Sequence, residues 1–509
     1  MKSTTVKLAI AMFAGIAAFA EAATTDYVWT GEAGNGLWSD AGNWQSQTKP
    51  ASSTSDTVIY LSDTGITLGE DGYAEISGAP TLGFCRLIFT NVRPLRVTGG
   101  ILTIGKYCGY ASWPTEAGSA IVCNSTSPVD LACDLYSTGQ RAIWLGVGAD
   151  LTLSGTVTAQ ENGSATFLQK YGPVNSRFSL AGEFSFAGLS GTAYDGTWAD
   201  NATICMRGGT NVIASAAVSK ISKPGTRIVF GSDYSETINT FAFFGAGTYE
   251  SEFVTHNLGS GIYFKVYFDG TCTFKENFKS LRTVGNYHLF STEGSEITFE
   301  KDLIFPGVST GFNLGQGTDL TVGGHFETAG LTDLDRVPAD MTVANFRLNG
   351  TAAATQIYTR YYNIIFGQDN VFTNRPLFTW GYYSSDVRGV YDMNGHDQTI
   401  GGINCVLGDP GWGGRLIKSD TPATLMIEDT ADHVAKSFIT GPVSVVYNPA
   451  GFHRLTLSNS TYAATGDLVI SNGAVRLVSG ASYPNANEIR ICPGAAFELE
   501  TTVTACCNC

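Results

Sequence analysis

The chain has 509 residues, of which 43% are hydrophobic and 15% are charged, and its formal net charge is −15. This length exceeds what one compact core usually supports, so either several domains or an elongated repeat is expected. The aromatic and aliphatic content excludes a wholly disordered chain. The negative charge argues against nucleic acid or an anionic membrane as a partner, because phosphates would be repelled.

The first 22 residues have the features of a secretory signal peptide. Lys2 and Lys7 provide positive charge, and Leu8 to Ala20 form an uninterrupted apolar run of 13 residues. Residues 20–22, Ala-Glu-Ala, then offer the small-x-small site that a signal peptidase requires. The run is shorter than the roughly 20 residues needed to span a bilayer, and no later segment approaches that length without charge or glycine. We therefore expect a secreted mature chain with no membrane span.

The next region, residues 23–84, is rich in tryptophan and is interpreted as an N-terminal cap. Trp29, Trp38 and Trp44 fall within the stretch VWTGEAGNGLWSDAGNW, although the whole chain has eight tryptophans. Separated by Gly- and Asn-rich turns, they could form a small aromatic nucleus that closes the end of a repetitive fold, since aromatic side chains bury roughly 150–250 Å² each. The alternative is that one of them stacks against a sugar.

Strand signals dominate the rest of the chain. Short β-branched or aromatic runs, each bounded by Gly, Asn, Asp or Pro, recur from residue 85 onward, as in RLIFT, ILTIG, DLTLSGTVT and GIYFKVYFDG. No apolar period of 3.6 residues holds for three turns beyond the signal peptide. We therefore expect an all-β protein over residues 85–500.

The strands repeat with a period close to 23 residues. The clearest copies are CTFKENF, ITFEKDL, LTVGGHF and MTVANFRL, which begin at Cys272, Ile297, Leu320 and Met341 and are offset by 25, 23 and 21 residues. Such a period is what one coil of a parallel β-solenoid requires, because a coil cannot bury its inward face without neighbours. The alternative is a series of antiparallel sandwiches, but few Asn-Gly or Asp-Gly pairs, which are typical of hairpin turns, separate the runs.

Two stretches of the chain resemble the autotransporter-associated β-strand repeat. That family has an LTLSG-type strand, a Tyr-containing turn, a strand with Asn-Gly-small-apolar, and a Gly-Ala-apolar strand. The corresponding sequences lie within residues 391–500, over Tyr391–Asn404, Leu416–Thr430 and Leu455–Glu500, and the Trp-rich opening resembles the element that often precedes such repeats. The resemblance implies a right-handed single-stranded parallel β-helix outside a bacterial cell, commonly adhesive or structural and without catalysis. Neither a β-barrel translocator nor an anchoring helix is visible in the sequence, which leaves export and attachment open.

β-Helices also carry polysaccharide lyases and glycosidases, which makes pairs of carboxylates candidate catalytic groups. Glycosidases need two carboxylates roughly 5–9.5 Å apart, and two loop pairs have short spacing, but acids in loops are more often turn formers. These pairs are Asp195 with Asp200, and Asp333 with Asp335 beside Arg336. We therefore assign no catalytic residue.

Metal and cofactor sites have little support in the sequence. Glu296, Asp319 and Asp340 precede three of the repeats and would stack on successive coils, where either solvent screening or a bound Ca²⁺ could relieve their repulsion. Screening is the plainer account. The six histidines occur singly, without a zinc-binding spacing, and no phosphate-binding glycine loop is present. We predict no metal and no cofactor.

One stretch beyond the cap looks like a binding site. Aromatic side chains lie beside glycines and charges in RPLFTWGYYSSDVRG and GDPGWGGR, where they could present ring faces to sugars or instead pack as a loop core. The candidate residues are Trp380, Tyr382, Tyr383 and Trp412.

Eleven cysteines leave the disulfide pairing undetermined. Four of them fall within fifty residues and could form one or two bridges: Cys85, Cys108, Cys123 and Cys133. Three mid-chain cysteines fit small buried hydrophobes: Cys205, Cys272 and Cys405. The Cys-rich tail, residues 501–509, could ligate a metal, bridge to another chain or mark an incomplete C-terminus.

The sequence favours a secreted or cell-surface β-solenoid with a structural or adhesive role. Its partners would be polysaccharide or components of a cell surface or matrix, held by many weak contacts. A β-helical polysaccharide lyase or hydrolase is the main alternative and would need a groove lined by carboxylates with Arg or Lys. A carbohydrate-binding module is the third and would place aromatic side chains on such a face without paired acids.

Overall fold

The computed structural model describes most of the chain between residues 24 and 500. The described ranges are 24–104, 116, 118–138, 141–160, 168–173, 175–182, 184–187, 203–207, 209–213, 227–230, 240–250, 252–255, 263–280, 286–333, 344–358, 362–379, 390–404, 415–435, 437–458, 462–478, 481–483 and 485–500.

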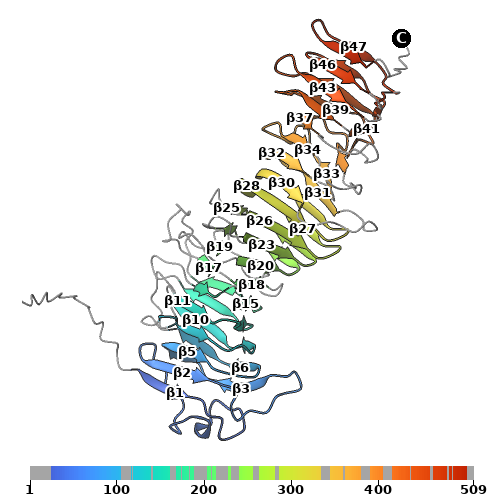
Figure 1. The fold of residues 1–509 in the computed structure, drawn as a ribbon. Coiled ribbons are helices and arrows are strands. Elements are labelled where there is room, and N and C mark those ends of the chain that lie inside the picture. The colour runs from blue at the N-terminus through green and yellow to red at the C-terminus, as the bar shows by residue number, and fades with distance from the viewer. Residues whose placement is uncertain are drawn as a thin grey trace, which may run out of the picture.

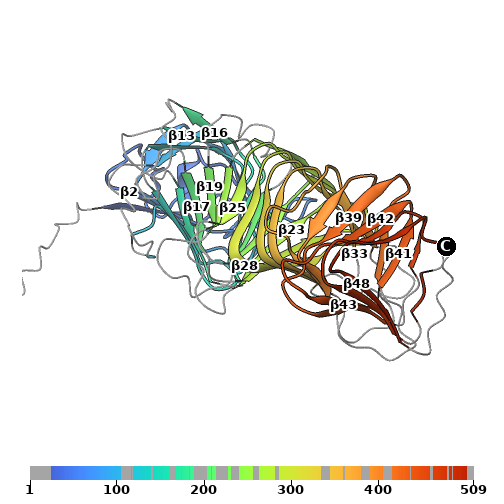
Figure 2. The same cartoon turned by 90° about the horizontal axis from the view of Figure 1, so that it is seen from above.

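The described chain winds into a parallel β-solenoid with three faces. Coils follow one another from the blue N-terminal end to the red C-terminal end of the stack (Figures 1 and 2). Every strand pairing within the described residues is parallel, apart from isolated bridges near the N-terminus. The prediction of a β-solenoid is confirmed, and two face-packed antiparallel sheets are not what this chain forms.

The first face carries one strand from each coil. Its strands are β1 (Thr25–Val28), β2 (Thr57–Leu61), β5 (Arg86–Phe89), β8 (Ile121–Cys123), β11 (Arg141–Leu145), β14 (Leu168–Tyr171), β17 (Thr203–Arg207), β19 (Arg227–Phe230), β22 (Glu252–Thr255), β25 (Phe278–Ser280), the first parts of β28 (Leu303–Asn313), β30 (Phe326–Asp333) and β32 (Ala352–Tyr358), and then β36 (Gln398–Ile400), β39 (Ala423–Ile427), β42 (Val443–Tyr447), β45 (Leu468–Ile470) and β47 (Ile489–Ile491).

The second face follows the first in each coil and includes the later parts of β28, β30 and β32. Its other strands are β3 (Ala74–Ala79), β6 (Leu95–Gly99), β9 (Val129–Leu131), β12 (Asp150–Leu153), β15 (Arg177–Leu180), β18 (Gly209–Ile213), β20 (Thr240–Phe244), β23 (Tyr263–Phe268), β26 (Asn286–Ser291), β34 (Leu377–Thr379), β37 (Gly402–Asn404), β40 (His433–Ala435), β43 (Arg454–Leu457), β46 (Ala474–Leu477) and β48 (Ala496–Leu499).

The third face closes each coil. Its strands are β4 (Leu82–Phe84), β7 (Ile101–Ile104), β10 (Asp134–Thr138), β13 (Val157–Gln160), β16 (Phe184–Ala187), β21 (Gly247–Tyr249), β24 (Thr271–Phe274), β27 (Glu296–Phe299), β29 (Asp319–Val322), β31 (Ala344–Leu348), β33 (Tyr362–Phe366), β35 (Val390–Asp392), β38 (Arg415–Lys418), β41 (Ser437–Gly441) and β44 (Tyr462–Ala464).

Alternating burial along the strands produces one continuous apolar core. In β31 the side chains of Ala344, Phe346 and Leu348 are buried, whereas Asn345 and Arg347 between them are partly exposed. This period of two residues is what a strand with one inward side chain in two requires. Inward residues of successive coils then stack, as Phe274 and Phe299 do with ring centroids 4.7 Å apart. Each coil therefore depends on its neighbours for burial.

The predicted register of the repeats holds for three of the four segments. Cys272 pairs with Ile297, and Ile297 pairs with Leu320. The fourth prediction was wrong, because Leu320 pairs with Phe346 and not with Met341, which lies outside the described residues. The strand is ANFRL, whose apolar residues at every second position fill the core. The number of residues per coil therefore varies, since the connecting turns differ in length.

The three tryptophans form a buried cluster at the N-terminal end. Trp44 makes edge contacts with Trp29 and with Trp38, at centroid distances of 5.2 and 5.0 Å. Their residues are 2%, 0% and 1% exposed for Trp29, Trp38 and Trp44, so no ring offers a face to a sugar. The turn η1 (Ala41–Asn43) begins at Asp40, whose side chain accepts a hydrogen bond from the Gly42 backbone N–H.

The segment around the tryptophans covers the first strand edge of all three faces. Gln45 donates its backbone N–H to the carbonyl of Val28 in β1. On β3, the Trp38 N–H donates to the Ser77 carbonyl, and on β4 the Ser53 N–H donates to the Gly83 carbonyl. Open edges invite pairing with other chains. The Trp-rich segment therefore acts as a cap, and coiling begins at β1, within the range expected for that cap.

The described cysteines divide into one bridged residue and several thiols. Cys85 is disulfide-bonded, whereas Cys123, Cys133 and Cys272 are free and buried. Burial raises the pKa of each of these three thiols to about 12, so they stay protonated. The prediction that Cys272 is a small buried hydrophobe is confirmed.

Candidate functional site

One row of outward side chains runs along the second face from coil to coil. Each member pairs with the next in register on adjacent strands. We call it the outward row; its members are Glu75, Arg96, Asp130, Thr152, Ser179, Val212, Phe243, Tyr267, Phe290 and Asn313. Side chains on this side of a strand are not needed to fill the core, so their chemistry is free to vary.

The aromatic segment of the outward row consists of Phe243, Tyr267 and Phe290. The ring of Tyr267 lies 4.3 Å from that of Phe243 and 4.6 Å from that of Phe290, with interplanar angles of 5° and 14°. These distances are close to the spacing of about 4.7–4.9 Å between neighbouring strands. The rings therefore stack along the solenoid axis, and all three are partly exposed.

The rings at the two ends of the stack differ in their surroundings. Tyr267 is stacked on both sides, whereas Phe243 stacks on Tyr267 alone among the described rings, and the next member of the row is Val212. Phe290 also has an edge contact with His288 and lies 5.7 Å from Lys265 Nζ. Toward the N-terminus, the members of the row that follow Phe243 have smaller side chains, namely Val212 and then Ser179. This decrease in side-chain size leaves space beside the open face of Phe243.

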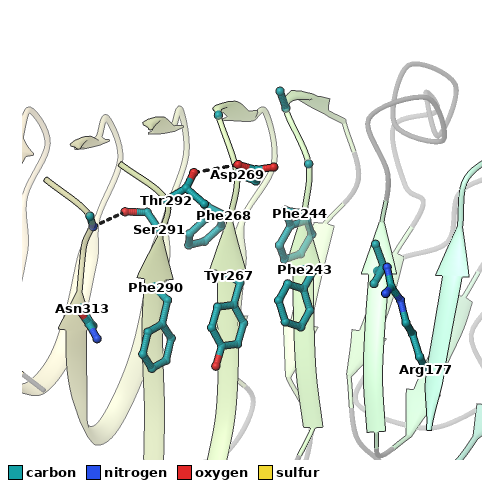
Figure 3. A pocket seen from close by; sticks show the side chains of 15 residues that line it. Arg177, Phe243, Phe244, Tyr267, Phe268, Asp269, Phe290, Ser291, Thr292 and Asn313 are labelled. Carbon is teal, nitrogen blue, oxygen red and sulfur yellow. Dashed lines mark hydrogen bonds between the residues drawn. The ribbon is translucent and has the colours of Figure 1, made fainter. Parts of the chain in front are cut away.

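A groove of about 760 Å³ follows this segment across several coils. Figure 3 shows the rings of Phe243, Tyr267 and Phe290 side by side on neighbouring strands, with Arg177 beyond one end of the stack and Asn313 beyond the other. The lining is mostly apolar along the rings and polar at the ends. A flat ring at the end of an open groove, flanked by hydrogen-bonding groups, is a stacking platform.

Polar groups border the groove where the second face turns into the third. Asp269 accepts a hydrogen bond of 2.8 Å from the Thr292 hydroxyl, and the Ser291 hydroxyl accepts one of 2.9 Å from the Gly315 backbone N–H. Burial raises the pKa of the Tyr267 hydroxyl above its usual value, so this group remains a neutral hydrogen-bonding group. Among the lining residues that the structure describes, Asp269 is the one carboxylate and Arg177 the one cation.

A second aromatic and basic row lies beside the first on the same face. Phe241, Lys265 and His288 pair in register on β20, β23 and β26. The Lys265 Nζ lies 5.8 Å from the ring centroid of Phe241 and 5.7 Å from that of Phe290, within the range of a cation–π contact. The lysine therefore helps to fix the rings that border the groove.

The binding residues proposed from sequence cannot be compared with this groove. Trp380, Tyr382, Tyr383 and Trp412 lie outside the described residues, as do Asp195, Asp200, Asp335, Arg336 and Asp340, and the side chain of Asp333 is not described. A signal for the groove was present in the sequence but was missed. Phe243, Tyr267 and Phe290 are offset by 24 and 23 residues and are all aromatic, close to the repeat period.

The predicted stack of acids is found in part. Glu296 and Asp319 are register partners, but the next rung places Asn345 there. The Asn345 amide donates a hydrogen bond of 2.7 Å to Asp319, and Arg347 Nε lies 3.7 Å from the same carboxylate. Neutral and basic neighbours therefore relieve the repulsion on one side of the stack.

Metal-binding clusters and membrane-spanning helices are both absent from the described part of the chain. It holds no group of three or more His, Cys, Asp or Glu side chains placed to bind a metal. It also contains no helix with the length and hydropathy needed to cross a membrane. Comparison of the chain with family models, curated proteins and solved structures finds no match.

Proposed function

We propose that this protein is a secreted β-solenoid that binds carbohydrate polymers through the groove along its aromatic segment. The observation that carries the proposal is the open ring face of Phe243 at the end of the Phe243–Tyr267–Phe290 stack. The apolar C–H face of a pyranose ring fits a flat aromatic face, and its hydroxyls fit the polar border at Asp269 and Thr292. The N-terminal signal and the resemblance to autotransporter-associated repeats support a role outside the cell.

The shape of the groove favours a polymer over a small molecule. The groove crosses several coils and is open along its length, so it offers a run of similar contacts in place of one deep pocket. Weak contacts of this kind add up when several are made at once by one chain. A rod that displays them suits adhesion to a surface or matrix, which is the structural role we infer.

The groove supports binding more than catalysis. Hydrolysis of a glycosidic bond needs two carboxylates roughly 5–9.5 Å apart, and the described lining contributes Asp269 alone. The proposal thus combines the adhesive and the carbohydrate-binding interpretations of the sequence. A lyase or hydrolase activity is the alternative that the experiment must exclude.

The test is a panel of polysaccharides assayed both for binding and for cleavage. We expect at least one neutral polysaccharide to bind without being cut, and Phe243→Ala to weaken that binding by about tenfold, which corresponds to about 1.4 kcal/mol. Phe452→Ala is the matched control, because Phe452 is 61% exposed and stands elsewhere on the solenoid. Cleavage of any polysaccharide, or equal binding by both variants, would contradict the proposal.

A further inference from the structure

A second cavity, of about 540 Å³, lies where the first face turns into the second near the C-terminal end. It is separate from the aromatic groove, since the two share no lining residue. Its polar lining consists of Thr355, Asn374, Arg375, Glu428, His433 and Asn448, together with Thr430. This set is rich in amides, hydroxyls and paired charges.

An ion pair forms one wall of this cavity. Arg375 Nη1 lies 2.7 Å from Glu428 Oε2, and the Glu428 side chain is 17% exposed. Glu428 Oε2 is itself buried and makes no hydrogen bond beyond this ion pair. Arg375 has a φ of 51°, a left-handed conformation that is costly for a residue with a side chain and that gathers at functional sites. The wall therefore carries two charges that cancel, with the Glu428 side chain still partly exposed.

Behind the cavity, a buried carboxyl supports the histidine of the lining. The Asp429 side chain is fully buried, and His433 Nε2 lies 3.6 Å from its Oδ1. Gly402 makes room for the pair, because a Cβ there would lie 2.2 Å from Asp429 Oδ1 and 2.8 Å from the His433 ring. The Tyr447 hydroxyl lies close enough to affect the pKa of Asp429, so the carboxyl, the tyrosine and His433 form one buried polar cluster behind the cavity.

The charges of the cavity select among possible ligands. The charges of Arg375 and Glu428 cancel, and burial lowers the pKa of His433, which keeps its ring neutral. A charged ligand would therefore bring an uncompensated charge into a partly enclosed site. A neutral ligand with several hydroxyls would instead use the exposed part of the Glu428 carboxylate, the Arg375 N–H groups and the amides of Asn374 and Asn448.

We propose that this cavity binds one neutral, hydroxyl-rich sugar unit, held by Glu428, Arg375 and His433. The inference rests on the proposed function, binding of carbohydrate, and adds a second subsite of different chemistry on the same rod. The groove would recognise a ring face by stacking, whereas the cavity would recognise hydroxyls by hydrogen bonds. Two subsites on one rigid scaffold would raise the avidity for a long glycan.

The experiment uses the whole chain with neutral probes, namely glucose, galactose, N-acetylglucosamine and cellobiose, and with glucuronate and glucosamine as charged probes. We expect saturation-transfer NMR to detect at least one neutral probe. Glu428→Gln should weaken its affinity by about tenfold, the size expected when a hydrogen bond to a charged group is lost. Glu488→Gln is the matched control, because Glu488 forms an exposed pair with Arg490 away from the cavity. Asn448→Ala is a second test variant in case Glu428→Gln unfolds.

The outcomes separate the two proposals. Loss of probe binding in Glu428→Gln or Asn448→Ala, with retention in Phe243→Ala and Glu488→Gln, supports the cavity. Binding of the charged probes alone, no binding of any neutral probe, or unchanged affinity in both cavity variants overturns it. If Phe243→Ala abolishes polysaccharide binding while the cavity variants change nothing, the proposed function stands and the second subsite falls. The opposite pattern removes the groove and keeps the cavity.

Discussion

The outward row contains two segments with opposite chemistry on the same backbone. Near the N-terminus, Arg96 pairs with Asp130 at 2.8 Å, also contacts Asp71, and lies 4.4 Å above the Tyr73 ring. Farther along, Phe243, Tyr267 and Phe290 present partly exposed rings that stack on one another. The charged segment satisfies its own groups, whereas the aromatic segment leaves apolar surface uncovered. Because both are built on equally regular strands, the fold does not require the aromatic one, and the proposed ligand would account for it.

The largest expected effect compares the inside and the outside of one strand in the aromatic segment. Phe244 points inward and is fully buried, while Phe243 next to it is partly exposed. Phe244→Ala should destabilise the protein by about 3–5 kcal/mol, as large-to-small core substitutions do. Phe243→Ala should cost about 1 kcal/mol, the worth of a lost ring pair. Urea unfolding measures both, and similar costs would mean that the outer rings are structural.

Acids have different partners in the charged segment and at the C-terminal cavity. Asp130 in the charged segment pairs with an arginine, whereas the buried Asp429 behind the cavity has a histidine beside it. Burial raises the pKa of Asp429 to about 7, with the Tyr447 hydroxyl opposing this effect and Asp432 adding to it, and His433 is the nearest basic group. The pKa of Asp429 is higher in the folded than in the unfolded chain. The protonated carboxyl therefore contributes fully to the free energy of unfolding below about pH 4, and this contribution is lost as the pH rises to about 7.

Replacing this acid should therefore remove a pH-dependent loss of stability. Relative to wild type, Asp429→Asn should gain about 4 kcal/mol in free energy of unfolding between pH 4 and pH 8, from the shift of the Asp429 pKa from 3.8 to about 7. Asp130→Asn, at an acid that pairs with Arg96, is the comparison variant. Denaturant unfolding at the two pH values provides the measurement, and parallel curves for wild type and Asp429→Asn would refute the expectation.

Adding a ring to the aromatic segment should weaken binding. Val212→Phe extends the stack by one rung and covers the open face of Phe243, so polysaccharide affinity should fall by about tenfold while stability rises by about 0.5–1.5 kcal/mol. Calorimetric titration and thermal unfolding follow the two effects. Tighter binding in this variant would show that ring edges, not the open face, hold the ligand.

The smallest effect belongs to the charged segment. Arg96→Gln removes the contacts with Asp130 and Asp71 and should cost about 1 kcal/mol, because the side chains are partly exposed and solvent screens the pair. Salt should reduce the difference from wild type. Polysaccharide binding by Arg96→Gln should equal that of wild type. A loss of binding in this variant would contradict the assignment of a structural and a binding segment within the outward row.

Much of the fold followed from local patterns. Alternation of apolar residues and the period near 23 residues predicted coils, and they placed Glu296 above Asp319 correctly. The rung at Phe346 was misplaced because the motif MTVANFRL offers two apolar alternations, and only the length of the preceding turn decides between them. The sequence predicted that the three tryptophans form a buried cluster. It could not predict the hydrogen bonds from this segment to the first strand of each face, because these depend on the path of the chain between the tryptophans.

The candidate sites were harder to predict because each combines residues from different coils. Phe243, Tyr267 and Phe290 become neighbours only when the register of β20, β23 and β26 is known. Arg375 and Glu428 are more than fifty residues apart, and Gly402 lies between them in sequence. The sequence search favoured clusters of aromatics within one stretch, whereas a solenoid assembles its surfaces across stretches.

The central claim is that the open ring face of Phe243 is a stacking platform for sugar. Affinity of the polysaccharide for Phe243→Trp and for Phe243→Leu tests it most directly, because both substitutions keep an apolar side chain and only the first keeps a flat ring. The account predicts that Phe243→Trp binds at least as tightly as wild type and that Phe243→Leu binds about tenfold more weakly. Equal affinities for the two variants would contradict it.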